Sequence, residues 1–425
     1  MLQINQIREN KEAILEGLAK RNKDFTAQIE EAIAIDETRR KTQNELDAIL
    51  AESNKLAKEI GDLFKSGKKD EADTLKAQTT ELKEKSKILE AELNKFEEAQ
   101  KQILYQIPNV PYKDVVFGKG ADDNVEVYHW GTRPDLGESK LPHWDLASQY
   151  GLIDFELGVK ITGAGFPVYT GHGARLQRAL INFFLDEARN AGYKEFMPPH
   201  MVNEASGYGT GQLPDKEGQM YYVKEDDLYL IPTAEVPLTN LYRDVILKED
   251  ELPILMTGYT PCFRREAGSY GKDVRGLNRL HQFDKVEIVQ LAHPSKSYEI
   301  LEQMVEHVKG ILEKLELEYR ILRLCGGDMG FTSAMTYDFE VYSAAQERWL
   351  EVSSTSNFET FQANRLKCRF KGADGKTQLV HTLNGSALAL PRIVAALLEN
   401  HQTADGIKIP KALVPYTGFE MIGKN

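Results

Sequence analysis

Residues 46–96 read LDAILAESNKLAKEIGDLFKSGKKDEADTLKAQTTELKEKSKILEAELNKF, and their spacing decides the fold of the first quarter of the chain. Apolar and small residues recur at steps of three and four in two runs, Leu46 to Leu63 and Ala72 to Phe96. This is the heptad spacing of a helix that buries one narrow seam. Gly67 and its charged neighbours, between the runs, are typical of a tight reversal. The pattern predicts two long helices that fold onto each other as an antiparallel coiled-coil hairpin.

The predicted hairpin is longer than a compact domain needs, because helices of about 38 residues reach roughly 55–60 Å. It is either a solvated spacer or dimer rod, or an arm that reaches a distant partner. Periodicity alone favours the spacer, since charged flanks of coiled coils usually face water. Before the hairpin, residues 1–24 carry apolar residues at helical spacing and predict one short amphipathic helix at its base.

A change of composition near residue 108 separates the hairpin from the rest of the chain. All 16 prolines lie at or after Pro108, and only three of the 32 glycines precede it. Proline cannot donate to a helical ladder and restricts the residue before it, so we place a linker at 108–111. The chain is therefore predicted to have an N-terminal coiled-coil domain over 1–107 and a second domain over 112–425.

The second domain alternates β-rich runs with turns. Runs at 228–231, 280–291 and 339–341 predict strands, and residues 175–191 predict a helix. Few helices interleave these strands regularly. We therefore expect an α+β domain with a mainly antiparallel sheet flanked by helices, rather than a doubly wound parallel sheet.

The composition bounds the function. With 425 residues, 41% hydrophobic and 28% charged, the chain has enough apolar material to fold into two or three domains. A net charge of −12 excludes a broad cationic surface, although a local basic patch could still bind nucleic acid. Three cysteines without CxxC spacing suit reduced thiols. No secretion signal or membrane-length apolar run is visible, so we expect a cytoplasmic protein that does not enter a membrane.

Common catalytic motifs are missing from the sequence. There is no GxxxxGK[ST] loop, no GxGxxG fingerprint, no HExxH pair and no GxSxG elbow. The nine histidines lack ligand spacing, so we interpret them as surface or core residues. What remains is a set of dispersed polar clusters in the second domain: residues 233–235, 264–266, 275–279, Glu287, 351–354 and Arg392.

Each cluster taken singly has an ordinary explanation. Arg264 and Glu266 could form an exposed ion pair on one strand face. Glu351 and Ser354 could belong to a helix end or a turn, and Phe283 could be a core residue.

Together with their flanks, these clusters resemble the class II aminoacyl-tRNA synthetases. GYKEFMPPHMV at 192–202 is similar to motif 1, the stretch 259–287 to motif 2, and LNGSALALPRIVAALLEN at 383–400 to motif 3. IPTAE at 231–235, RGLNRLHQFDKVE within motif 2, LEVSSTSNF at 350–358 and the long hairpin resemble the bacterial-type seryl-tRNA synthetases. Motif 3 has Ala387, Ala389 and Pro391 where the class usually carries glycines and an acidic residue, a form familiar in the seryl family.

The resemblance implies a two-step reaction. The carboxylate of L-serine attacks the α-phosphorus of ATP to give seryl-adenylate, and serine is then transferred to tRNA(Ser) and also to tRNA(Sec). Positioning and charge neutralisation drive such chemistry, which suits arginines and carboxylates. A homodimer formed through motif 1 is also implied.

The resemblance also assigns roles to residues. The catalytic residues would be Arg264 on the α-phosphate, Arg392 on the γ-phosphate, and Glu351. Glu351 and Ser354 would hold Mg²⁺ together with ATP. The other ATP-binding residues would be Arg265, Glu266, Arg279, Leu280, Phe283, Val352 and Ser353. Serine would be bound by Thr233, Ala234, Glu235, Arg264, Glu287, Asn384 and Ser386.

The resemblance reverses the interpretation of the hairpin, which becomes a tRNA-binding arm. Residues 1–100 hold 18 basic and 22 acidic side chains, so a binding face must be segregated from the rest. The expected contacts come from Arg39, Arg40, Lys41, Lys55, Lys58, Lys83, Lys85 and Lys87. Two alternatives stay open: a non-catalytic coiled-coil adaptor with an inert synthetase-like head, and a class II synthetase for another small amino acid such as proline or threonine.

Overall fold

The computed structural model describes residues 1–138, 140–266 and 275–423. Two compact units emerge, one formed by Met1–Ala19 and Lys23–Pro108, the other by Lys20–Asn22 and Asn109–Asn425. Positions 267–274 of the predicted motif 2 lie outside the described residues.

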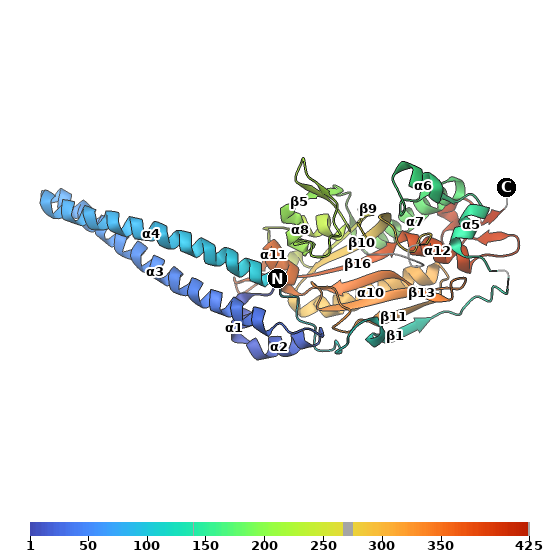
Figure 1. The fold of residues 1–425 in the computed structure, drawn as a ribbon, viewed down its shortest axis with the longest axis horizontal. Coiled ribbons are helices and arrows are strands. Elements are labelled where there is room, and N and C mark those ends of the chain that lie inside the picture. Colours follow the sequence, from blue (N-terminus) through green and yellow to red (C-terminus); the bar gives the residue numbers. More distant parts are fainter. Residues whose placement is uncertain (139, 267–274, 424–425) are drawn as a thin grey trace. The chain divides into compact units, whose positions relative to one another are not determined.

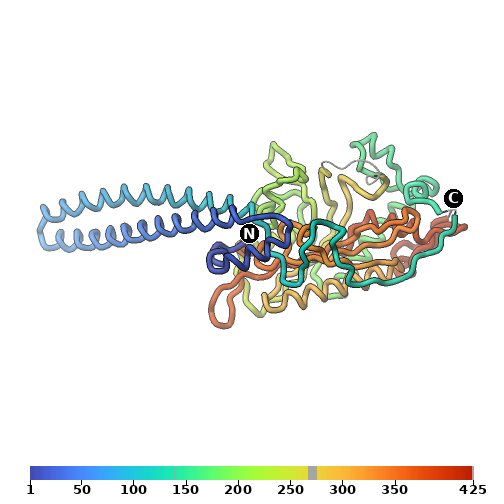
Figure 2. Tube along the Cα trace, turned by 60° about the horizontal axis from the view of Figure 1, so that its bottom comes forward, coloured from blue at the N-terminus to red at the C-terminus, as the bar shows by residue number. Residues whose placement is uncertain are grey.

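The first unit is built on the predicted helical hairpin. Helices α3 (Thr26–Lys65) and α4 (Lys69–Leu104) run side by side along their length (Figures 1 and 2). The chain reverses between them at Gly67, whose φ of +77° lies in the left-handed region that glycine favours. Within the two heptad runs only the seam positions are shielded from solvent: Leu46, Ile49, Ser53, Leu56, Ile60 and Leu63 on α3, and Ala72, Leu75, Thr79, Leu82, Ser86, Leu89, Leu93 and Phe96 on α4.

At the base of the hairpin, the prediction of one helix over residues 1–24 is wrong. The segment forms α1 (Ile4–Glu9) and α2 (Lys11–Ala19), separated at Asn10. Asn10 leaves the helical conformation, and its backbone N–H and side-chain amide both donate to the carbonyl of Gln6. Asparagine favours such local hydrogen bonds over a continuous helix.

A buried carboxylate ties the base of the hairpin together. Asp36 on α3 accepts from Arg8 on α1 at 2.6 Å, from Arg39 at 3.0 Å and from Gln100 on α4 at 3.1 Å. Burial alone would raise the pKa of Asp36, but the hydrogen bonds from Arg39, Gln100 and Arg8 outweigh it, so the pKa lies below its ordinary value.

The second unit is organised around one eight-stranded sheet. Its order is β1-β11-β12-β13-β16-β10-β9-β4, and every pair is antiparallel except β4 with β9. The predicted α+β fold with a mainly antiparallel sheet is confirmed. The strands are β1 (Val125–Trp130), β4 (Lys194–Glu195), β9 (Ile254–Phe263), β10 (Gln282–Ala292), β11 (Tyr319–Arg323), β12 (Met335–Ser343), β13 (Arg348–Asn357) and β16 (His381–Ala389).

One face of this sheet packs on three amphipathic helices, α7 (Gly171–Asn190), α10 (Ser297–Lys314) and α12 (Leu390–Asn400). Strand residues alternate between the faces. Val286 and Ile288 of β10, and Phe339 and Val341 of β12, belong to this core. The alternate residues of the same strands therefore project from the opposite face, and that face carries the polar clusters.

Smaller elements surround the sheet. The helices are α5 (His143–Gln149), α6 (Phe155–Ile161), α8 (Glu204–Thr210), α9 (Glu235–Asn240), α11 (Thr360–Leu366) and α13 (Val414–Thr417), with 3-10 turns at Ala121–Asp123, Glu249–Glu251 and Pro294–Lys296. The short strands are β2 (Ile153–Asp154), β3 (Val168–Tyr169), β5 (Met201–Asn203), β6 (Tyr222–Val223), β7 (Leu228–Leu230), β8 (Ile246–Lys248), β14 (Arg369–Lys371), β15 (Thr377–Leu379), β17 (Gly406–Lys408) and β18 (Met421–Gly423). Among the described residues, no helix has the length and apolar character needed to cross a membrane.

Candidate active site

Four neighbouring strands place the candidate residues on one face of the sheet. In β10, Phe283, Lys285 and Glu287 follow at steps of two, and Glu287 lies opposite Ser386 of β16. Two residues before Ser386, Asn384 lies opposite Ser356 of β13. Residues directly opposite in antiparallel strands share a face. Ser354, two residues before Ser356, lies opposite Asp338 of β12. Residues distant in sequence are thereby gathered on one surface.

A buried polar cluster surrounds Glu287. Its Oε2 lies 2.6 Å from Nζ of Lys285 and accepts from Oγ1 of Thr233 at 3.3 Å. Only 2% of Glu287 and 6% of Lys285 are exposed, so the pair is shielded from water. The backbone N–H of Glu235 donates to the same Thr233 hydroxyl at 3.2 Å, which fixes the start of α9 beside the pair.

Glu235 brings a second carboxylate to this cluster. Its Oε1 accepts from Nε2 of Gln362 on α11 at 2.6 Å. Burial, followed by the charge of Glu287, raises the pKa of Glu235 to about 7. Two carboxylates facing one ammonium leave the cluster short of positive charge when both are ionised. The cluster is therefore suited to bind an ammonium group.

Arg264 is held above an aromatic ring next to this cluster. Its guanidinium carbon lies 5.2 Å from the centre of the Phe283 ring, and its Nε donates to the carbonyl of Pro232 at 3.3 Å. Phe283 is half-buried and packs against the edge of the main hydrophobic core, so its interpretation as a core residue holds in part, while the arginine lies over its ring. The guanidinium can bind an anion on its remaining edge.

Glu266 pairs with Arg279 rather than with Arg264. The interpretation of Arg264 and Glu266 as an ion pair on one strand face is therefore wrong. Glu266 lies beyond the end of β9 with a φ of +47°, so the two side chains do not follow strand alternation. Arg265 is exposed, and its backbone N–H donates to Gln219.

Arg392, in the first turn of α12, connects motif 2 to β13. Its Nε donates to the carbonyl of Asn278 at 3.0 Å, and its Nη1 donates to the carbonyl of Glu351 at 2.8 Å. Nη1 also lies 3.8 Å from the Glu351 carboxylate. Glu351 and Ser354 both lie within β13, so their interpretation as a helix end or a turn is wrong.

The oxygens near Glu351 form a donor set for a hard cation. The Ser354 hydroxyl donates to Asp338 at 2.5 Å and lies 3.4 Å from Oε1 of Glu351. Since its single hydrogen is used by Asp338, its lone pairs remain for a ligand. Burial and the charge of Glu351 raise the pKa of Asp338 well above its ordinary value. The described residues contain no group of three or more His, Cys, Asp or Glu side chains that could hold a metal alone. Two carboxylates and a hydroxyl fit Mg²⁺ that is also bound by phosphates.

Some predicted site residues turn their side chains elsewhere. Val352 and Leu280 belong to the hydrophobic core on the other face, and Ala234 is buried in a smaller apolar cluster beside α11. Ser353 donates to the carbonyl of Ser386 at 2.6 Å. Only the main chain of these residues could contact a ligand.

Three polar residues of the site escaped the sequence reasoning: Lys285, Gln362 and Asp338. Lys285 could have been predicted, because Phe283, Lys285 and Glu287 are two residues apart and therefore share one face of a strand. Gln362 and Asp338 reach the site only through packing and strand pairing that no local pattern specifies.

The basic residues predicted to bind tRNA lie along the hairpin. Arg39 is partly buried and pairs with Asp36, whereas the other seven are exposed. Lys83 and Lys87 are four residues apart on α4 and share a face. Lys85 points away from that face and forms an ion pair with Glu81 at 2.7 Å.

The fold and the charged face define a class II aminoacyl-tRNA synthetase. A family profile described as the tRNA synthetase class II core domain (G, H, P, S and T) matches residues 221–401. A second profile, described as the seryl-tRNA synthetase N-terminal domain, matches residues 1–111.

Relatives that match along the whole chain narrow the class to one family. The serine–tRNA ligase of Salinibacter ruber is 50% identical over 100% of this chain and 99% of its own, and that of Akkermansia muciniphila is 46% identical over 99% of each. A crystal structure of seryl-tRNA synthetase from Pyrococcus horikoshii complexed with ATP superposes with a TM-score of 0.92 at 35% identity, covering 100% of both chains. The chain belongs to the serine–tRNA ligase family, and the resemblance stated from the motifs is confirmed.

Proposed function

We propose that the protein activates L-serine with ATP and transfers the serine to tRNA(Ser). One observation carries this proposal: the polar face of the sheet holds a buried cluster that is short of positive charge, with Arg264 next to it and with Arg392 bound to Glu351 of β13. Glu287 and Glu235 can bind the ammonium group of an amino acid. Arg264 lies next to them, where it can bind the carboxylate of the same amino acid. The full-length relatives are serine–tRNA ligases, which supports the same activity.

In the activation step, Arg264 would hold the serine carboxylate against the α-phosphate of ATP. Its planar fork can contact both anions, and Phe283 below it offers a ring face to adenine. Arg392 would neutralise the γ-phosphate while its Nε and Nη1 stay bound to two carbonyls that fix its direction. Glu351, Ser354 and Asp338 would hold Mg²⁺, which shields phosphate charge when it is bound.

Selection of serine would follow from the polarity of the cluster. Thr233, Glu235 and Ser386 offer hydrogen bonds to a substrate hydroxyl inside a buried environment. An amino acid without that hydroxyl leaves buried partners unpaired, so alanine should be rejected strongly. Threonine would be rejected mainly by volume.

The arm would bind tRNA through its exposed lysines and Arg40. Deleting the outer part of the hairpin should abolish tRNA charging and spare the exchange of pyrophosphate into ATP. Loss of both activities would contradict an arm devoted to tRNA. Charging of tRNA(Sec) and a cytoplasmic location are further parts of the proposal.

A homodimer through motif 1 would explain exposed apolar side chains in that region. Met197 and Met201, both inside motif 1, are 90% and 46% exposed. Large apolar residues left in water often mark a protein interface. Sedimentation equilibrium should give twice the mass of 48.1 kDa.

The experiment that tests the proposed function is a pyrophosphate exchange assay over a panel of amino acids. Serine should support exchange, while proline, threonine and alanine should not. The variant Arg264→Ala should lose the activity. An inert adaptor would show no exchange with any amino acid, and a synthetase of other specificity would prefer another member of the panel.

A further inference from the structure

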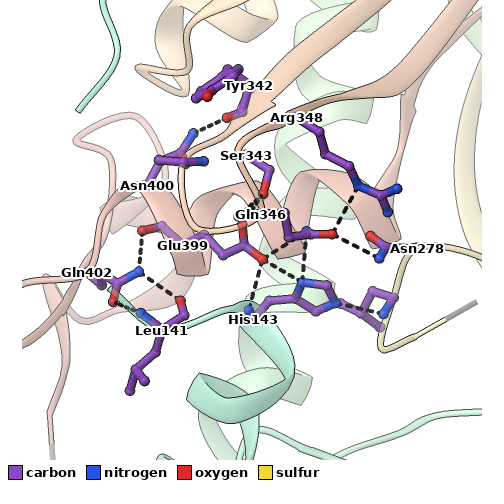
Figure 3. Close-up of polar contacts among 12 residues, drawn as sticks. Leu141, His143, Asn278, Tyr342, Ser343, Gln346, Arg348, Glu399, Asn400 and Gln402 are labelled. Atoms are coloured by element: carbon purple, nitrogen blue, oxygen red, sulfur yellow. Dashed lines mark hydrogen bonds and ion pairs between the residues drawn. The ribbon is translucent and has the colours of Figure 1, made fainter. Parts of the chain in front are cut away.

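A buried carboxylate near the end of α12, Glu399, is the centre of a second network of hydrogen bonds. Glu399 is fully buried and accepts from the backbone N–H of His143 at 2.9 Å, from Nδ1 of the same histidine at 2.7 Å and from Nε2 of Gln346 at 3.0 Å. The hydroxyl of Ser343 donates to it as well. Figure 3 shows Glu399 at the centre of these groups. Four donors satisfy the hydrogen-bonding capacity of this carboxylate in the interior.

The hydrogen bonds on its two ring nitrogens define how His143 acts. A carboxylate can only accept, so Nδ1 carries the proton that is shared with Glu399. On the other side of the ring, Nε2 accepts from the backbone N–H of Leu277 at 2.8 Å, inside the core. His143 thereby joins the end of α12 to the backbone of motif 2.

The motif 2 backbone lies directly against this ring. A Cβ added to Gly276 would come within 2.2 Å of Nε2 of His143, and the residue has a φ of +65°. Both the space and the backbone conformation therefore require glycine. Beside it, the guanidinium carbon of Arg275 lies 4.5 Å from the centre of the Trp144 ring, next to His143.

The segment fixed in this way carries contacts of the proposed ATP site. The carbonyl of Asn278 accepts from Arg392, and the side chain of Asn278 donates to Gln346 at 3.0 Å. Arg279, the next residue, pairs with Glu266. A displacement of the Leu277 backbone would move the Asn278 carbonyl that accepts from Arg392, and it would also move the backbone of Arg279.

We propose that His143 is a positioning residue for ATP. Its Nε2 accepts from the Leu277 N–H and thereby holds residues 276–279 in place. In that position of the segment, Arg279 and Arg392 can both bind the phosphates of ATP. Glu399 fixes the orientation of the imidazole ring. This inference rests on the proposed function. It assigns His143 no contact with serine, so its effect must be selective for the nucleotide.

Two substitutions separate the nitrogens of the ring. Glutamine at 143 can place an oxygen near the position of Nε2 and keep an acceptor for Leu277. Asparagine can place an amide near Nδ1 and keep a donor for Glu399, but it leaves the buried Leu277 N–H unpaired. In pyrophosphate exchange, His143→Asn should raise the KM for ATP about tenfold, and His143→Gln at most about threefold. The KM for serine should stay within about twofold in both variants.

A glycine pair gives an independent test that leaves His143 intact. Gly276→Ala should raise the KM for ATP like His143→Asn, since its methyl group would push the segment off the ring. The matched control is Gly375→Ala, because Gly375 has a similar φ of +79° with nothing within 4 Å of an added Cβ. This control shares the backbone strain and should leave the KM for ATP unchanged.

The outcomes distinguish the inference from the proposed function. The inference is supported if the wild type shows serine-dependent exchange and the KM for ATP rises about tenfold in His143→Asn and Gly276→Ala, but at most about threefold in His143→Gln and not in Gly375→Ala. Three results would overturn the inference while the proposed function stands. The first is an equal effect of His143→Asn and His143→Gln on the KM for ATP, and the second is a KM for ATP that neither His143→Asn nor Gly276→Ala changes. The third is a parallel rise in the KM for serine. A wild type without serine-dependent exchange would overturn both. Should His143→Asn fail to fold, the glycine pair decides.

Discussion

Replacing Glu235 by glutamine should stabilise the second unit at alkaline pH and weaken serine binding in the same protein. Burial and Glu287 raise the pKa of Glu235 from its ordinary 4.5 to about 7. Each pKa unit is worth about 1.4 kcal/mol, so keeping this carboxylate ionised in the folded state costs about 3 kcal/mol. Glutamine removes the charge and keeps an oxygen for the hydrogen bond from Gln362.

The sign of the pH dependence follows from linkage. Because the folded-state pKa lies above the unfolded value, the folded state binds the proton more tightly. The stability that this group contributes is complete below pH 4.5 and is lost as the pH rises through about 7. The stability gained by Glu235→Gln over the wild type should therefore grow by about 2 to 3 kcal/mol between about pH 5 and about pH 8.5.

Urea unfolding followed by tryptophan fluorescence measures this difference. All three tryptophans, Trp130, Trp144 and Trp349, belong to the second unit, so the signal reports that unit alone. The KM for serine, measured in parallel, should rise because the cluster loses a carboxylate. A stability difference that is the same at both pH values would refute the reasoning, since it would mean that Glu235 does not titrate between them.

Three further predictions concern other charged groups. Lys285→Met should lower the free energy of urea unfolding of the second unit by about 3 to 5 kcal/mol, because Glu287 would be buried without its partner; an unchanged midpoint would contradict the pairing. Arg392→Lys should lower kcat/KM for ATP in exchange about a hundredfold, because an ammonium cannot reach both carbonyls that the guanidinium spans; retained activity would exclude that role. Asp36→Asn should lower the free energy of unfolding of the first unit near neutral pH by about 1 to 3 kcal/mol, measured by urea unfolding followed by circular dichroism. That difference should shrink as the pH falls through the lowered pKa of Asp36, and a difference that persists in acid would contradict the ion pairs.

The helical hairpin could be predicted from the sequence because a coiled coil is specified locally. The heptad rhythm of residues 46–96 decides which side of each helix is buried, and Gly67 supplies the reversal. The division of the first 24 residues into two helices could not be predicted in this way. It depends on Asn10, whose side chain and backbone both turn to Gln6, while apolar periodicity continues across it.

The candidate site was predictable where residues act on one strand. Phe283 and Glu287 share a face by their spacing alone, and the same spacing included Lys285. Asp338 and Gln362 could not be found in this way, because register and helix packing bring them to the site from distant strands and helices. The network around His143 is a similar case, since its partners are 134 and 256 residues away in sequence.

The central claim is that a buried carboxylate on this sheet face binds the ammonium of serine beside the ATP site. The most direct measurement is the KM for serine and for ATP of Glu287→Gln in pyrophosphate exchange. A rise of about a hundredfold for serine, with the KM for ATP changed less than about threefold, is the predicted result. An unchanged KM for serine would contradict the account.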